Sequence, residues 1–427
     1  MSSPSTQSHA SPSSLRAWTG AILSWRVESK TLATAIQALF CYALTSLVVL
    51  LGVVFGHRFV DVRVDAHTAK GSLLSAFAKQ DGSWYKQVVT QGYSYNPDKK
   101  SSVAFFPLYP LLAASLMHVT SLGPEAALLI VSHVCLAAAF VLMAVYVRQR
   151  FAAPPLGFAN YVLLSLGLMP ATLFFRMAYS ESLFVLLSIL ALLAMARRWP
   201  LLVVAAIIGL ATAARPVGVG LLAPFLLHCW YRSSTPREFV LKTAFLLPIS
   251  CWGIAGYALY QGIRFGEPLA FVQTQSNWGR SPVPLSEKLF SLLTYEPIWQ
   301  VYDRFSPFYW GAGEPYPRNP FFCWAAVNPL YFVLTVILVP IGACKRWLSS
   351  YETLLAIALL LIPYFTRGHE MFMSSQARFA AAVFPVYLVL GHILARLPGP
   401  VPGALLGVSA FFLGAFSALF ATWHHVF

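Results

Sequence analysis

The sequence is short of charge, and above all of carboxylates. Only 10% of its 427 residues are charged whereas 58% are hydrophobic, and 29 lysines and arginines stand against 15 aspartates and glutamates. A water-soluble domain needs far more charge to cover its surface, so the composition predicts a polytopic membrane protein. The positive charges are scattered between apolar spans rather than gathered in basic runs, so no nucleic-acid partner is predicted.

Two kinds of site are also missing. The six cysteines lie within or at the ends of apolar spans and none has CxxC spacing, so neither a disulfide framework nor a metal site is predicted. No glycine-rich nucleotide loop is present. His133 and His392 have no second ligand residue one turn away, and we interpret them as hydrogen-bonded core histidines. No cofactor is predicted, although dependence on a divalent cation stays open.

Apolar runs predict an all-α fold with eleven transmembrane helices. The predicted spans are 34–55, 126–147, 157–175, 182–195, 201–213, 217–230, 240–260, 323–344, 353–365, 379–397 and 403–423. Residues 34–427 are therefore expected to form one transmembrane domain. Residues 1–33 precede it as a disordered Ser/Pro-rich tail, 1–14, and an interfacial helix that begins at Leu15.

Loop charge sets the predicted orientation, because Lys and Arg in short loops favour the cytoplasmic side. With a cytoplasmic N-terminus, the clusters at 148–150, 197–198, 232–237 and 345–346 all fall inside. This requires that the proline-containing segment 103–119 lies against the outer leaflet, within a first outer loop of residues 56–125. A second large outer loop covers residues 262–319. The polar islands at 81, 176–182, 215–216, 262–319 and 367–378 then share the outer face, so one outward-facing site is possible.

Asp81 is the best-placed candidate for chemistry in the first outer loop. Gly82 after it lets a substrate approach the backbone, and Trp84 and Tyr85 offer ring faces on which a sugar can stack. A carboxylate beside the membrane surface can take the proton of an acceptor hydroxyl as a glycosidic bond forms. Taken alone, however, Asp81 is better explained as the N-cap of a helix over residues 83–91.

An ordered set of short motifs resembles the PIG-V family, the second mannosyltransferases of glycosylphosphatidylinositol assembly and their bacterial relatives. The motifs extend in order from Asp81 to Pro385 and so cover most of the chain. They are Asp81-Gly82-Ser83-Trp84-Tyr85, Gly92-Tyr93, Phe105-Phe106-Pro107-Leu108-Tyr109-Pro110, Ala178-Tyr179-Ser180-Glu181-Ser182-Leu183-Phe184, Ala214-Arg215-Pro216-Val217-Gly218, Arg378-Phe379 and Phe384-Pro385. Each is weak by itself, and their order makes the set specific. The chain departs from the family pattern at Gln80, where a Trp usually precedes the acidic residue.

The resemblance implies a GT-C fold with interfacial helices and a catalytic acid, here Asp81, in the first outer loop. It further implies an inverting glycosyltransferase that uses a polyprenyl- or dolichyl-phosphate sugar, usually mannose, and acts on a lipid-linked or glycolipid acceptor. The outer face would be periplasmic in a bacterium and the lumenal side of the endoplasmic reticulum in a eukaryote. The residues expected to bind substrate are Trp84, Tyr85, Phe106, Tyr109, Tyr179 and Glu181.

A lipid-phosphate donor needs cations to hold its charge. Arg378, beside Gln376, and Arg215 are the candidates, because each lies at the outer end of a predicted helix and can hold two phosphate oxygens. Each is also explained as a snorkelling interface arginine. Glu181 lies at the mouth of a span, where an arginine or a substrate hydroxyl is expected to pair with it.

The aromatic residues of the second outer loop have two possible roles. Most are expected to form an aromatic belt at the membrane interface, and some could line a groove for a glycan or lipid. They are Trp278, Trp299, Tyr302, Phe308, Tyr309 and Trp310. A lipid or glycolipid transporter is the alternative function for such a basic, aromatic-rich chain. A transporter should show matched internal repeats, and the sequence contains no second copy of the Asp81 or Phe106-Pro107 region.

Overall fold

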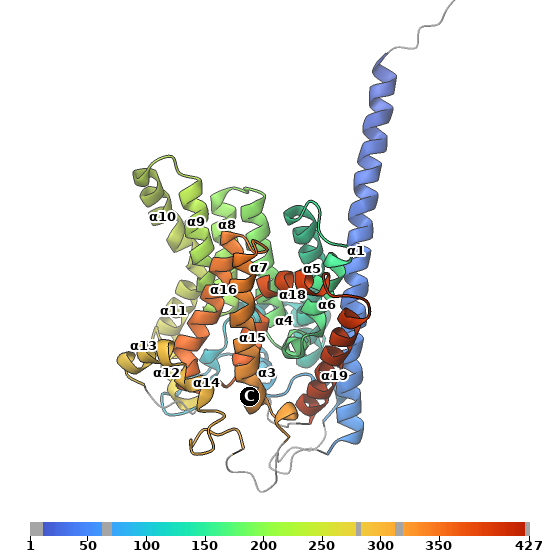
Figure 1. Ribbon diagram of the computed structural model, residues 1–427. Coiled ribbons are helices and arrows are strands. Elements are labelled where there is room, and N and C mark those ends of the chain that lie inside the picture. The colour runs from blue at the N-terminus through green and yellow to red at the C-terminus, as the bar shows by residue number, and fades with distance from the viewer. Residues whose placement is uncertain (1–11, 62–70, 279–282, 312–318, 423–427) are drawn as a thin grey trace, which may run out of the picture.

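The computed structural model describes residues 12–61, 71–278, 283–311 and 319–422, with side chains from residue 31 onward, and this part of the chain is all-helical. Residues 1–11 of the predicted tail lie outside it. The interfacial helix expected from Leu15 is not separate, because α1 runs unbroken from Pro12 to Phe59 (Figure 1). No proline or glycine lies between Lys30 and Thr34, so nothing in the sequence ends the helix there.

The described residues of the N-terminal half form twelve helical elements. They are α1 (Pro12–Phe59), α2 (Leu73–Ala76), α3 (Asp81–Gln91), η1 (Ser102–Ala104), α4 (Leu108–Thr120), α5 (Pro124–Arg150), α6 (Phe158–Leu168), η2 (Pro170–Arg176), α7 (Glu181–Ala196), α8 (Leu201–Ala214), η3 (Pro216–Leu221) and α9 (Leu222–Tyr231).

The described residues of the C-terminal half continue in the same way. The elements are α10 (Pro236–Ser250), α11 (Trp252–Phe265), α12 (Ala270–Gln273), η4 (Thr274–Trp278), α13 (Leu285–Thr294), α14 (Glu296–Trp299), η5 (Pro320–Phe322), α15 (Trp324–Cys344), α16 (Ser350–Pro363), η6 (Tyr364–Gly368), α17 (Gln376–Ala381), α18 (Pro385–Leu394) and α19 (Val401–Ala421).

The predicted count of eleven membrane-spanning helices is not confirmed. Over the described residues four helices are long and apolar enough to cross a membrane, namely 31–59 of α1, α5, α15 and α19. The bent pairs α6 with η2, at 75°, and α10 with α11, at 51°, raise the number to six if each is one span. Other predicted spans are helices of 10–17 residues. A 14-residue helix is only about 21 Å long, against about 30 Å of bilayer core.

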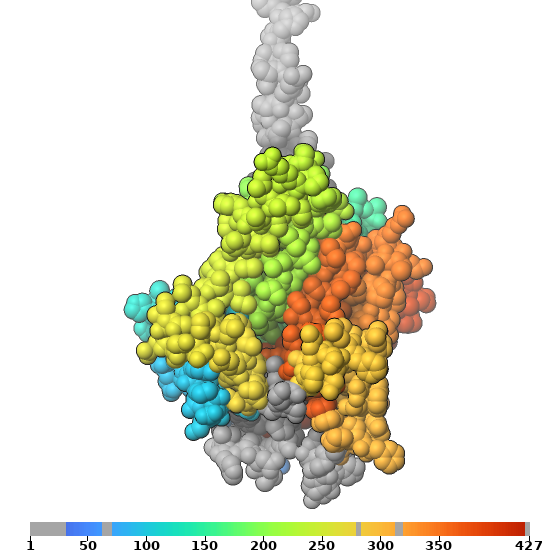
Figure 2. All heavy atoms as spheres, turned by 90° about the vertical axis from the view of Figure 1, so that its left-hand side faces the viewer, coloured from blue at the N-terminus to red at the C-terminus, as the bar shows by residue number. Residues whose placement is uncertain are grey.

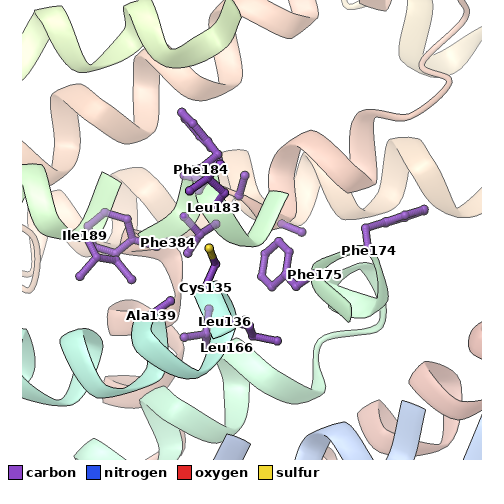
Figure 3. Packing of buried hydrophobic residues seen from close by; sticks show 14 of the residues in the cluster. Cys135, Leu136, Ala139, Leu166, Phe174, Phe175, Leu183, Phe184, Ile189 and Phe384 are labelled. Atoms are coloured by element: carbon purple, nitrogen blue, oxygen red, sulfur yellow. The ribbon is translucent and has the colours of Figure 1, made fainter. Parts of the chain in front are cut away.

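The core lies where α5, η2, α7 and the segment before α18 meet. Figure 3 shows Phe175 and Phe184 there, together with Cys135 of α5 and Phe384. At one edge α1 packs directly on α19, and a Cβ on Gly52 would lie 2.3 Å from the carbonyl oxygen of Gly414. Only glycine allows so close a backbone approach. The exposed large apolar side chains of α1 and α19 form a surface suited to lipid rather than to water.

The basic loop clusters and the polar islands lie at opposite ends of the bundle. At one end, where α8 begins and α9 ends, neighbouring arginine clusters are linked. Arg197 Nε donates to Gln149 Oε1 at 2.7 Å, and Arg232 Nη1 donates to the carbonyl oxygen of Arg198 at 3.3 Å. At the other end lie α3, α12, α13 and α14 (Figure 1). The predicted grouping of the polar islands is therefore present in the fold, while the side of the membrane that they face stays a prediction.

Cysteine labelling tests that orientation. In a background with the exposed Cys344 changed to Ser, we expect Ser83→Cys to react with a membrane-impermeant maleimide added outside intact cells and Gln149→Cys to react only after permeabilisation. Both native side chains are exposed and they belong to opposite ends of the bundle. The reverse pattern would show that the predicted orientation is inverted.

Candidate active site

A cavity of about 610 Å³ opens at the end of the bundle that holds α3. Its walls come from α3, the segment around η1, the ends of α8 and α16, η4 and α17. Charged side chains lining it are Asp81, Lys100, Arg215, Arg367 and Arg378, and apolar ones include Phe105, Phe106, Phe271 and Trp278. Figure 2 shows this side of the molecule, with the yellow segment that carries α12 and η4 facing the gold segment of α13. All five predicted polar islands contribute to this one cavity.

Asp81 begins α3 and points into the cavity. The N-cap position belongs to Gln80, which has a φ of 54°, and no side chain caps the helix. The carboxylate of Asp81 instead accepts a hydrogen bond at Oδ2 from Arg378 Nη1, at 2.5 Å. Its backbone N–H donates to the Tyr179 hydroxyl at 3.2 Å. The capping role that Asp81 alone suggested is therefore not the role its carboxylate has in the structure.

Glu181, the first residue of α7, lies directly behind the cavity. Its side chain is fully buried, and its Oε1 forms ion pairs with both Arg378 Nε and Arg215 Nη1. Arg378 therefore bridges the two carboxylates Asp81 and Glu181, and we call these four residues the charge network. The arginine partner that the sequence predicted for Glu181 is present twice.

Burial decides how the two arginines of the network act. Arg215 and Arg378 are each only 8% exposed, so neither extends to the membrane interface as a snorkelling side chain does. Arg378 also packs its guanidinium over the ring of Tyr179, 4.7 Å from the centroid. Each arginine lines the cavity, so both are within reach of an anionic ligand there.

Aromatic rings form another part of the cavity wall. Trp84 stacks on Phe105 with ring centroids 5.9 Å apart, and Trp278 lies 5.4 Å from Trp84. Lys100 places its ammonium 5.1 Å from the centroid of the Trp278 ring. Tyr85 also lines the cavity, and its hydroxyl donates to Ser180 Oγ at 2.9 Å. Burial together with the charge of Glu181 raises the pKa of its phenol. Aromatic faces with hydroxyl and cationic groups suit a sugar phosphate.

The residues predicted from sequence divide into two groups. Asp81, Trp84, Tyr85, Phe106, Arg215 and Arg378 line the cavity. Glu181, Tyr179, Tyr109 and Gln376 do not, since each is fully buried and bonded to the protein. Tyr109 donates to the carbonyl oxygen of Leu128 at 2.9 Å, and Gln376 Nε2 to that of Pro363 at 3.2 Å. In the structure these four support the cavity wall, and their contact with a substrate stays a prediction.

Sequence reasoning missed Lys100, Arg367 and Phe271, which also line the cavity. Arg367 donates to Gln275 at 2.7 Å and lies 5.5 Å from the centroid of the Phe379 ring. No spacing along the chain brings these segments together, although the charge of Arg367 within a predicted outer island was a usable signal. Of the six aromatic residues singled out in the second outer loop, Trp278 alone lines the cavity.

The two histidines that the sequence singled out are bonded to neighbouring side chains. His133 Nδ1 lies 2.8 Å from the Tyr42 hydroxyl and His392 Nδ1 lies 3.0 Å from Arg396 Nη1, so both are hydrogen-bonded as predicted. In the described ranges no three His, Cys, Asp or Glu side chains are grouped to hold a metal ion.

No protein-family model matches the chain, and no curated protein matches it. Among solved structures it is similar to the oligosaccharyltransferase of Archaeoglobus fulgidus. The apo form gives 12% identity and a TM-score of 0.43 over 90% of this chain and 56% of that one. The complex of the same enzyme, AglB, with an inhibitory peptide and a dolichol-phosphate gives 12% identity and a TM-score of 0.40 over 93% and 56%. The chain thus spans little more than half of these enzymes, and its chemistry has to be argued from its own cavity.

Glu181→Gln tests whether the charge network holds the cavity together. The change leaves two buried guanidinium groups without their shared counter-charge, so we expect a loss of about 3–5 kcal/mol in the free energy of unfolding. Glu125→Gln is the matched control, because Glu125 pairs at 2.5 Å with Lys86 at a partly exposed position and its loss should cost about 0–1 kcal/mol. Thermal unfolding of the purified variants in detergent measures both, and equal effects would contradict the assignment.

Proposed function

We propose that this chain is an integral-membrane inverting glycosyltransferase. It transfers a sugar, with mannose expected, from a polyprenyl-phosphate donor to a hydroxyl of a lipid-linked glycan or glycolipid on the outer face of the membrane. The observation that supports this most is the cavity itself, in which one accessible carboxylate, Asp81, lies among an excess of cations and beside stacked aromatic rings.

The balance of charge favours a phosphate-bearing donor. Four cationic side chains and one carboxylate line the cavity, and Glu181 directly behind adds a second carboxylate, which leaves an excess of two positive charges. A sugar phosphodiester has one negative charge, and the phosphate monoester released from it has about −1.5 to −2. The cavity is therefore better matched to the leaving group than to the donor, as catalysis requires.

Asp81 supplies the base. Its Oδ2 is bonded to Arg378, while Oδ1 accepts no hydrogen bond from the described residues, so an acceptor hydroxyl can donate to it. The acceptor oxygen attacks the anomeric carbon and its proton passes to Asp81. The bond from that carbon to the phosphate oxygen breaks on the opposite face, and the phosphate keeps the electron pair. The configuration at the anomeric carbon is inverted.

The positions of the family-like motifs also support the proposal. Asp81, Phe106, Ser180, Arg215 and Arg378 come from five separate motifs, and all of them line the cavity. In an unrelated helical protein, residues so far apart in the chain have no reason to meet in one cavity. The assignment to a PIG-V-like mannosyltransferase is therefore part of the proposal.

Asp81→Asn tests the base directly. Asparagine has nearly the same shape but cannot take a proton as a carboxylate does, so transfer should fall about 10²–10⁴-fold. The measurement is transfer of radiolabelled mannose from polyprenyl-phosphate mannose in membranes containing each variant at equal protein level. Asp98→Asn, an exposed carboxylate in the same outer loop, is the control and should keep wild-type activity. Near-normal turnover in Asp81→Asn would remove the catalytic role.

Arg378→Lys tests the donor phosphate contact. Lysine keeps one positive charge but loses the planar fork that reaches two oxygens, so KM for the donor should rise about tenfold while KM for the acceptor changes little. Arg264→Lys, an exposed arginine at the end of α11, is the control. Donor titration at saturating acceptor gives the result. An unchanged donor KM in Arg378→Lys would move the phosphate contact to Arg215.

A lipid or glycolipid transporter is the second candidate, favoured by the two sharply bent helix pairs. Broken helices of this kind line transport sites in many carriers. The bent pairs here lie at α6–η2 and α10–α11, and none of their residues lines the cavity around Asp81. Passage of fluorescent glycolipid across proteoliposomes, without any sugar transfer, would favour the transporter.

A further inference from the structure

A second cavity lies on the α1 side of the bundle, away from the charge network. It has a volume of about 280 Å³ and lies between α1, α5 and η2. Arg176 and His133 line its inner part, and Ala43, Leu47 and Leu50 of α1 line its mouth. Leu47 and Leu50 are 48% and 43% exposed, so the mouth opens on the apolar surface of α1.

Arg176, the last residue of η2, is fully buried at this cavity. Its guanidinium donates from Nε to Ser46 Oγ at 2.9 Å and from Nη2 to Thr45 Oγ1 at 2.6 Å. Nη1 donates to the carbonyl oxygen of Thr172 at 3.5 Å. Every one of these acceptors is neutral. Within the described part of the chain, no aspartate or glutamate pairs with this arginine.

A buried charge without a counter-charge is expensive. The other buried arginines show what this chain does elsewhere: Arg215 and Arg378 are both paired with Glu181. Arg176 differs from them in having only hydroxyl and carbonyl partners, although it lines a cavity that is also lined by exposed residues of α1. The missing negative charge can therefore come from a ligand that enters through the mouth.

The mouth limits what that ligand can be. A free anion would have to cross the apolar surface around Leu47 and Leu50. A lipid, in contrast, can bring its phosphate to the cavity while its acyl chains stay against that apolar surface. We propose that this cavity binds the phosphate of an anionic membrane lipid, with Arg176 as the counter-ion and Ser46 beside it. Three of the five N–H groups of this guanidinium bond to the protein, which leaves two to donate to phosphate oxygens. The site does not depend on the proposed function.

The position of this lipid site connects it to the larger cavity. Phe77 lines the small cavity, and its carbonyl oxygen accepts a hydrogen bond from the Ala178 backbone N–H at 3.0 Å. The next residue along, Tyr179, accepts from the backbone N–H of Asp81. A lipid held by Arg176 would therefore brace the same short segment that positions the start of α3.

Native mass spectrometry of the full chain tests this proposal. The purified protein is incubated in detergent with dioleoylphosphatidylglycerol, which has one negative charge, or with dioleoylphosphatidylcholine, which has the same chains and no net charge. We expect the wild type to retain the anionic lipid about tenfold more, as one charge-assisted contact allows. Arg176→Gln should lose this preference. Arg148→Gln should keep it, because Arg148 also bonds to a threonine of α1, Thr34, but is exposed and lies outside the cavity.

A second variant keeps the test decisive if Arg176→Gln does not fold. Ala43→Trp fills the mouth while leaving the guanidinium in place, and it should abolish the preference in the same way. Inorganic phosphate is added as a competitor in a separate arm. The lipid assignment is overturned if phosphate displaces the bound phosphatidylglycerol, if the wild type shows no preference, or if the preference survives in Ala43→Trp.

Discussion

The charge network of Asp81, Glu181, Arg215 and Arg378 is the constraint on which the rest of the site depends. In a bundle with few carboxylates, a buried guanidinium without a counter-charge is costly, and one oxygen of Glu181 pairs with two of them. That sharing ties α7, the end of α8 and α17 to the start of α3. It also holds Asp81 at the cavity wall with its second carboxylate oxygen available, so structural support and proposed chemistry come from the same four side chains.

The residue pattern predicted which side chains line the cavity better than it predicted the contacts among them. Asp81, Arg215 and Arg378 were selected from sequence and do meet in one cavity. The ion pair between Asp81 and Arg378, and the sharing of Glu181 by Arg215 and Arg378, could not be predicted, because the segments lie far apart in the chain and only the packed fold decides which of them touch. Tyr109 and Tyr179 belonged to specific motifs for a different reason from the one expected: their hydroxyl groups satisfy backbone atoms behind the wall.

Helix length was the weaker part of the prediction. Hydropathy located most of the helices, but the count of eleven crossings is not confirmed. Pro170 and Pro385 interrupt apolar runs that look continuous on average, and Pro216 separates two short ones. The same interruptions are useful to the site. They bring Arg215 and the segment after η2 into the interior at helix ends, where backbone and side-chain polar groups can face a cavity instead of lipid.

The excess of two positive charges has a kinetic meaning in the proposed reaction. A cavity that favours the released phosphate monoester over the sugar-bearing diester lowers the barrier to transfer, but it also holds the spent lipid more tightly than the incoming one. Turnover would then be set by exchange of long-chain lipids at the cavity mouth rather than by formation of the glycosidic bond. The turnover rate of such an enzyme would depend on how fast lipids exchange in the surrounding bilayer. Accumulated carrier lipid would inhibit it as a product, without any dedicated regulatory site.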